Sequence, residues 1–130
     1  MPGTTVYPIT IAELVSYSRD ADELFDGDEH EHLKEFLAVY PEGGDVLPGT
    51  GGVRKLVWPV KRQGKVSEMQ VVYLFRDLNM PLYLLAIYPE GERIDFSDAW
   101  CAEIEKLVAE LIEEHSKLWA HVINGQEKGA

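Results

Sequence analysis

Three strand-like segments follow one another at hairpin spacing in the middle of the chain, and this succession constrains the fold more than any other feature. They span residues 53–60, 68–75 and 81–88, and short turn-like stretches at 61–66 and 77–80 separate them. Strands that follow one another so closely form an antiparallel meander. The last segment is nearly continuously apolar, which is typical of a central strand buried on both faces.

Alternation along the first two strands divides their side chains between the two faces of the predicted sheet. Pro59 predicts that the first strand ends or bulges there, because proline cannot donate to a strand ladder. In the first strand, one face is expected to carry Val53, Lys55 and Val57, and the other face Arg54, Leu56 and Trp58. In the second strand, one face is expected to carry Met69, Val71, Tyr73 and Phe75, and the other face Gln70, Val72 and Leu74.

The segment before the meander predicts one strand and two helices. Residues 4–11 are β-rich but contain Pro8, and residues 11–18 can form a short helix before an acidic, turn-like stretch at 20–27. Asp28 is a plausible N-cap for a second helix. Pro41 ends that helix, because the residue before a proline avoids the α region. The buried face of this helix is expected to consist of Leu33, Phe36, Leu37 and Tyr40.

A glycine- and proline-rich stretch at 41–52 reads as a long loop. After the meander, Ser97 can cap a long helix over about 97–124, which Asn124-Gly125 would end, leaving a flexible tail at 125–130. The element order is then β-α-α-β-β-β-α. We therefore predict a single α+β domain over residues 1–124, with helices packed on a small antiparallel sheet.

The charge is unevenly distributed along the chain. Twelve Lys and Arg stand against 23 Asp and Glu, and a formal net charge of −11 argues, taken alone, against a nucleic-acid binder. Residues 46–76 nevertheless carry +5 and the remainder −16. Because the electrostatic potential at a surface depends on where the charges lie, this basic segment can still bind an anionic ligand. The alternative is a solvated strand pair with ordinary surface lysines.

Several site classes find no support in the residues. The glycine-rich stretch at 48–52 lacks the Lys-Ser/Thr pair of a phosphate-binding loop. One cysteine permits neither an internal disulfide nor a Cys/His zinc cluster, and a reducing, cytoplasmic location is the default expectation. We also expect no metal and no cofactor. No apolar run is long enough to span a membrane. We expect His30 and His32 to be solvated, His115 and His121 to lie at the surface or core edge, and Cys101 to be packed.

Cations and tyrosines on the three strands and their turns form the most suggestive set of polar residues. Cationic side chains stabilise a pentacovalent phosphate, a tuned Lys or Tyr can transfer a proton, and tyrosine rings can stack on bases. Exposed cations and tyrosines also occur in strand proteins of every kind, which is the alternative explanation. The set consists of Arg54, Lys55, Lys65, Tyr73, Tyr88 and Arg93.

Residues 40–58, YPEGGDVLPGTGGVRKLVW, resemble a motif of the HigB-like branch of the RelE/ParE toxins, NPEAGDVIPGTGGIRKIRW. The stretches QVVYLF at 70–75 and PLYLLAIYPEGERIDFS at 81–97 resemble two further strands of that family, and the similarity spans roughly residues 4–110. The resemblance implies a RelE-like fold and a toxin of a type II toxin–antitoxin module. Such toxins are metal-independent endoribonucleases that cleave mRNA at the ribosome by attack of the 2′-OH on the adjacent phosphate.

By the same resemblance, the chain would have a cognate antitoxin, the ribosome and mRNA as partners. Arg54 and Lys65 would act on phosphate with Arg93, and Tyr73 would stack or shuttle a proton. The residues that would bind RNA are Lys55, Lys61, Arg62, Gln70 and Tyr88.

The sequence departs from the family pattern inside this predicted site. Gln70 replaces an arginine, Pro89 and Glu90 stand where a lysine is usual, and Glu68 falls in a run that is normally basic. Three hypotheses follow: an active or weakened endoribonuclease, a catalytically diverged RelE-like binding or regulatory protein, or a function unrelated to RNA on the same scaffold. The apolar stripe of the long C-terminal helix could pack internally, form a homodimer, or occupy an antitoxin surface.

Overall fold

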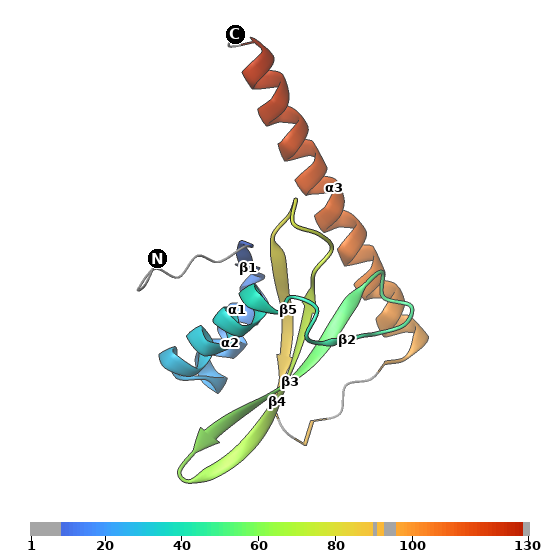
Figure 1. Cartoon of the computed structure of the whole chain (residues 1–130). Helices are drawn as coiled ribbons and strands as arrows, with labels where there is room; N and C mark the ends of the chain where they lie inside the picture. The colour runs from blue at the N-terminus through green and yellow to red at the C-terminus, as the bar shows by residue number, and fades with distance from the viewer. Residues whose placement is uncertain (1–8, 90, 93–95, 129–130) are drawn as a thin grey trace.

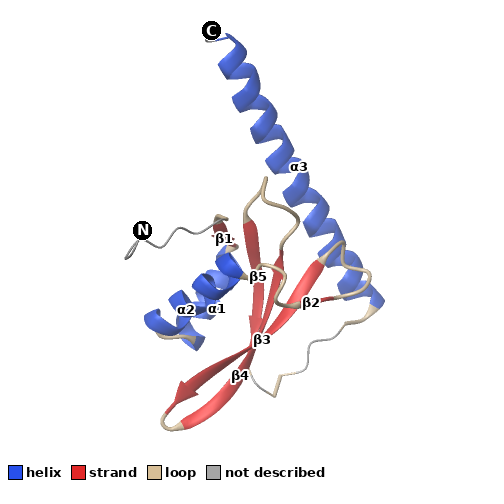
Figure 2. Cartoon of the chain, in the orientation of Figure 1, coloured by secondary structure: helices blue, strands red, loops and turns tan. Residues whose placement is uncertain are grey.

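The computed structural model describes residues 9–89, 91–92 and 96–128, which form a five-stranded sheet with helices on both faces (Figure 1). Figure 2 separates the helices from the strands. The strand order across the sheet is β1-β5-β4-β3-β2. The elements are β1 (Ile11–Glu13), α1 (Val15–Leu24), α2 (Gly27–Val39), β2 (Asp45–Val46), β3 (Val53–Arg62), β4 (Lys65–Leu74), β5 (Leu82–Tyr88) and α3 (Asp98–Lys128).

The predicted meander is confirmed, but the prediction of a wholly antiparallel sheet is wrong. Strands β3, β4 and β5 pair antiparallel in sequence order, with Lys55 opposite Val72 and Val72 opposite Ala86. Strand β1 pairs parallel with β5, so the sheet is mixed. Hairpin spacing determines strand direction only between neighbours in sequence. The direction of β1 depends on its contact with a strand about 70 residues away, where the Leu82 N–H donates to the Thr10 carbonyl.

Each face of the sheet carries its own apolar core. Helices α1 and α2 cover one face, which we call the α1–α2 face, and α3 crosses part of the other, the α3 face (Figure 1). The predicted alternation is confirmed on β4, where Met69, Val71 and Tyr73 belong to the first core and Val72 and Leu74 to the second. Strand β5 contributes to both cores, as predicted for a central strand.

The helices before the meander begin elsewhere than predicted. Residues 11–13 form β1, and α1 runs from Val15 to Leu24 through most of the stretch predicted to be a turn. The N-cap of α2 is Asp26 instead of Asp28. Its side chain accepts from the Glu29 N–H at 2.8 Å, and the Glu29 carboxylate accepts from the Asp26 N–H at 3.0 Å. This reciprocal capping box satisfies two N–H groups, which explains the earlier start.

Three boundaries after α2 also differ from the sequence prediction. The loop at 41–52 contains the two-residue strand β2, whose Asp45 and Val46 pair with β3. Strand β3 continues through Pro59, because β2 pairs only with its first residues and Pro59 lies in an edge stretch where proline is tolerated. Helix α3 begins as predicted after Ser97, whose hydroxyl accepts from the Trp100 N–H, but it continues through Gly125 to Lys128. A glycine inside a helix costs about 1 kcal/mol and does not by itself terminate it.

Candidate functional site

The residues predicted to act on RNA divide between the two faces of the sheet. Arg54 and Tyr73 lie opposite each other on β3 and β4 and share the α1–α2 face. Lys55 lies on the α3 face, because successive side chains of a strand point to opposite sides. The predicted division of Arg54 and Lys55 between opposite faces is therefore confirmed, and the two side chains cannot approach one phosphate from the same side.

Tyr73 has a structural position, which corrects its predicted role in stacking or proton transfer. The side chain is fully buried. Its hydroxyl donates to the Pro41 carbonyl at 2.9 Å and accepts from the Gly44 N–H at 2.8 Å. Burial raises the pKa of Tyr73, although the Gly44 N–H and Arg54 oppose this shift. The ring is closed to a nucleobase, and the hydroxyl holds the loop after α2 against the sheet.

Arg54 is engaged with the same loop. One guanidinium nitrogen, Nη1, donates to the carbonyls of Glu42 at 3.2 Å and Gly44 at 2.8 Å. The Nε atom is buried and has no hydrogen-bond acceptor among the residues that the structure describes. These contacts bind the guanidinium to backbone carbonyls on the α1–α2 face, and its catalytic role stays a prediction.

An open surface lies on the α3 face where α3 no longer covers the strands. Val57, Gln70 and Tyr88 form one row across β3, β4 and β5. Val57 is 45% exposed although it lies within the sheet. The Gln70 amide donates to the Glu92 carbonyl at 3.1 Å. We call this surface the open face, and its members are Lys55, Val57, Lys61, Gln70, Tyr88 and Phe96.

Lys55 and Phe96 meet at the end of the open face nearest α3. The Lys55 ammonium nitrogen lies 5.7 Å from the centroid of the Phe96 ring, within cation–π range. The Trp100 ring meets Phe96 edge-on, with centroids 5.3 Å apart and an interplanar angle of 77°. A cation and an exposed aromatic ring thus lie together on a surface that is otherwise built from strand residues.

The remaining predicted residues lie at or beyond the margins of this face. Arg62 and Lys65 are opposite each other at the end of the β3–β4 hairpin, and Lys65 is exposed. By alternation from Met69, Lys65 lies on the α1–α2 face. The predicted contribution of Arg93 and the departure at Glu90 fall outside the described residues.

Acidic side chains lie next to the open face. Glu68 is exposed two residues before Gln70 on β4, and so shares its side of the sheet. A pocket of about 330 Å³ beside Tyr88 is lined by Asp20, Glu23 and Glu92 among others. These carboxylates repel phosphate, so the favourable part of the surface is limited to the neighbourhood of Lys55 and Lys61.

Sequence reasoning did not select Phe96 or Val57 as site residues. Phe96 directly precedes the N-cap Ser97, a position where an apolar residue ordinarily packs on the first turns of a helix. Val57 fits the alternating pattern of a strand with a buried face, so the sequence indicates a core residue at this position. The contact between Lys55 and Phe96 joins residues 41 positions apart, and no local signal in the sequence indicates it.

No protein-family model matches this chain. Within residues 9–89, 91–92 and 96–128, no helix is both long and apolar enough to cross a membrane. In the same part of the chain, no group of three or more His, Cys, Asp or Glu side chains is arranged to hold a metal ion.

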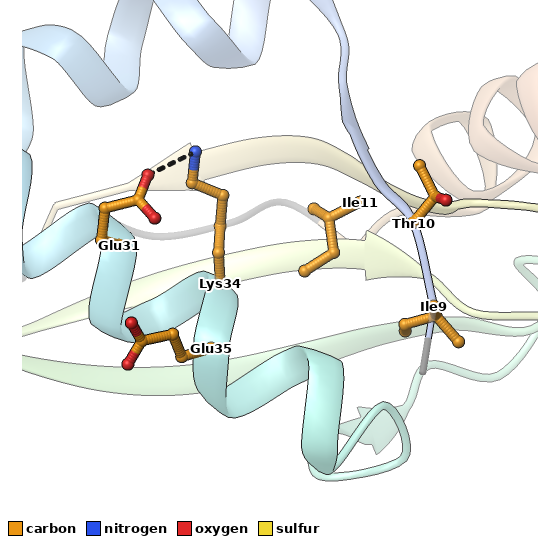
Figure 3. Close-up of a pocket in the computed structure, with 6 residues that line it drawn as sticks. All are labelled: Ile9, Thr10, Ile11, Glu31, Lys34 and Glu35. Carbon is orange, nitrogen blue, oxygen red and sulfur yellow. Dashed lines mark ion pairs between the residues drawn. The ribbon is translucent and has the colours of Figure 1, made fainter. Parts of the chain in front are cut away.

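A second concave region lies between β1 and α2, away from the predicted site residues (Figure 3). Ile9 and Ile11 contribute apolar side chains from the β1 segment, and the Lys34–Glu31 ion pair, at 3.2 Å, lies on the helix side. The cavity measures about 280 Å³. Lys34 is also paired with Glu13 at 3.3 Å, so its charge is neutralised within the protein.

His30 belongs to a packed polar cluster behind this region, and the prediction that it is solvated is wrong. Its side chain is 13% exposed and stacks on Phe25 with ring centroids 5.4 Å apart. The Nε2 atom is hydrogen-bonded to the Tyr17 hydroxyl at 3.1 Å. Burial lowers the pKa of His30, although Glu13 opposes the shift.

We expect His30 to make stability depend on pH. Its pKa in the folded state lies below the unfolded value of about 6.5, so the contribution is present above that value and is lost as the pH falls through the folded-state pKa. The free energy of unfolding, measured with urea at several pH values from 8 down to 5, should therefore fall less in His30→Gln than in the wild type. His32→Gln, an exposed control two residues away, should keep the wild-type profile. Identical profiles for all three proteins would contradict this assignment.

Proposed function

We propose that this chain is a RelE-like toxin-type domain that binds single-stranded RNA on its open face. The observation that carries the proposal is that four of the five residues predicted to bind RNA share this surface. Lys55 and Lys61 come from β3, Gln70 from β4 and Tyr88 from β5. Lysine cations can pair with phosphates, the Gln70 amide can form hydrogen bonds with base edges, and aromatic rings can stack on unpaired bases.

RNA cleavage at the ribosome is the second candidate function, and the resemblance of residues 40–58 to the HigB-like motif favours it. The reaction would be attack of the 2′-OH on the adjacent phosphate, with no metal. Arg54 and Tyr73 are bound to the loop at 41–44, which leaves the catalytic part to Lys65, Arg93 and Tyr88. Binding without efficient cleavage, the behaviour of a diverged regulatory domain, therefore fits the geometry better.

The partners expected from the resemblance remain part of the proposal. They are a cognate antitoxin and, for a cleaving domain, the ribosome with its mRNA. A homodimer through α3 is a further possibility, since the helix extends well past the sheet (Figure 1) and Leu118 is 62% exposed on it.

Two measurements test binding and cleavage separately. We expect a labelled, unstructured oligoribonucleotide to show increased fluorescence anisotropy with the purified chain, and the affinity to fall as salt rises. Absence of binding at low salt would refute the proposal. Induced expression in bacteria, with primer extension on cellular mRNA, then reports cleavage. Growth arrest with mRNA cleavage that is lost in Lys65→Ala would establish the nuclease, whereas binding without cleavage would establish the regulatory alternative.

A further inference from the structure

Phe96 is an exposed aromatic ring that contacts two neighbouring side chains. It is 42% exposed and directly precedes Ser97, the N-cap of α3. Trp100 contacts it edge-to-face, and the Lys55 ammonium lies over the ring at 5.7 Å. A single exposed apolar residue is ordinary on a protein surface, so exposure alone implies nothing. The Lys55 cation over one face of the ring distinguishes this position from the other exposed apolar residues that the structure describes.

We propose that Phe96, with Lys55 over one face of its ring, is a stacking site on the other face for one unpaired nucleobase of single-stranded RNA. This inference rests on the proposed function and adds to it a ligand position that the resemblance did not imply. An unpaired nucleotide presents an apolar π-face and an adjoining phosphate. The Phe96 ring meets the first, and the Lys55 ammonium, which has three donors, can pair with the second.

The position of Phe96 next to Lys55 of β3 fits an extended, single-stranded ligand. Lys55 lies in the row with Val72 and Ala86, and the next row, two residues further along each strand, contains the half-buried Gln70 and Tyr88. Rows on one face are about 7 Å apart. Phe96 and Tyr88 thus offer two aromatic rings along one path. Every base has a π-face, so we expect a site of this kind to tolerate different sequences.

A purely structural role for Phe96 makes different predictions. As the residue before the N-cap, it could serve only to pack on the first turn of α3 against Trp100. If this were its only role, an aliphatic side chain of similar size at position 96 would leave RNA binding unchanged. Stacking on a nucleobase requires an aromatic ring, so leucine should preserve the packing and lose the binding.

The experiment compares Phe96→Leu and Phe96→Tyr with the wild type. The ligands are an unstructured oligoribonucleotide and the same ribose-phosphate chain without bases, and circular dichroism monitors folding. We expect Phe96→Leu to bind the base-bearing RNA about tenfold more weakly and the abasic chain unchanged, while Phe96→Tyr stays within a few-fold of the wild type. Leu78→Ala, at an exposed apolar residue of the turn before β5, should bind like the wild type.

The outcomes separate the two proposals. If the wild type binds neither ligand, the proposed function fails and the stacking site fails with it. If the wild type binds RNA but Phe96→Leu binds it equally well, the function stands and the stacking site is overturned. An equal loss of affinity for the base-bearing and abasic chains would also overturn it, because stacking cannot change the affinity for a chain without bases.

Discussion

Tyr73→Phe is expected to lower the free energy of unfolding by about 2–3 kcal/mol, although the substitution removes a single oxygen atom. The Tyr73 hydroxyl satisfies both the Gly44 N–H and the Pro41 carbonyl on the loop after α2. Phenylalanine fills the same space but leaves a buried donor and a half-buried acceptor without this partner, and a buried unsatisfied group costs about 1–3 kcal/mol. Urea unfolding followed by circular dichroism measures the difference.

Tyr40→Phe is the matched control for this prediction. Tyr40 is 59% exposed at the C-terminal end of α2, so loss of its hydroxyl should change the stability by no more than about 0.5 kcal/mol. If Tyr73→Phe were equally harmless, the hydroxyl would not hold the loop. The catalytic or stacking role implied by the resemblance would then have to be reconsidered.

Lys55→Glu combined with Lys61→Glu is expected to abolish most RNA binding. The double variant converts two phosphate-pairing cations on the open face into repelling anions, next to Glu68 and the carboxylates near Tyr88. We expect the affinity at low salt to fall on the order of a hundredfold, and the slope of log affinity against log salt to decrease by about two. Fluorescence anisotropy over a series of salt concentrations measures both quantities.

The control for this variant must separate local from global charge. Lys106→Glu with Lys117→Glu makes the same change of net charge on exposed positions of α3. If the open face binds RNA, this control should weaken binding only slightly. Equal losses in the two double variants would indicate that the overall charge of −11 governs the affinity, and that no particular face is responsible.

Lys55, varied in the second experiment, is adjacent in sequence to Arg54 but lies on the other side of the sheet. Arg54 and Lys55 appear together in the motif, and the resemblance implied a catalytic role for Arg54 and an RNA-binding role for Lys55. In the fold, Arg54 donates to the carbonyls of Glu42 and Gly44 on one side of the sheet, and Lys55 lies over Phe96 on the other. Within this one stretch of sequence, Arg54 therefore holds a loop, while Lys55 lies on the open face.

Features that depend on neighbours in sequence were predictable from the sequence alone. Hairpin spacing and period-two alternation determined the β3–β4–β5 meander and the division of Met69, Val71 and Tyr73 from Val72 and Leu74. The Ser97 N-cap of α3 followed from a side chain that bonds three residues ahead. In each case the physical cause, a turn, a pleat or a cap, acts over a few residues.

Only the tertiary structure decided which polar residues are available to a ligand. Tyr73 is closed to solvent because a loop about 30 residues away folds onto its hydroxyl, and His30 is packed because Phe25 and Tyr17 meet it. The parallel direction of β1 and the meeting of Lys55 with Phe96 likewise depend on contacts between distant segments. Burial and hydrogen bonding between such segments depend on the packing of the whole chain, and the identity of a residue does not reveal them.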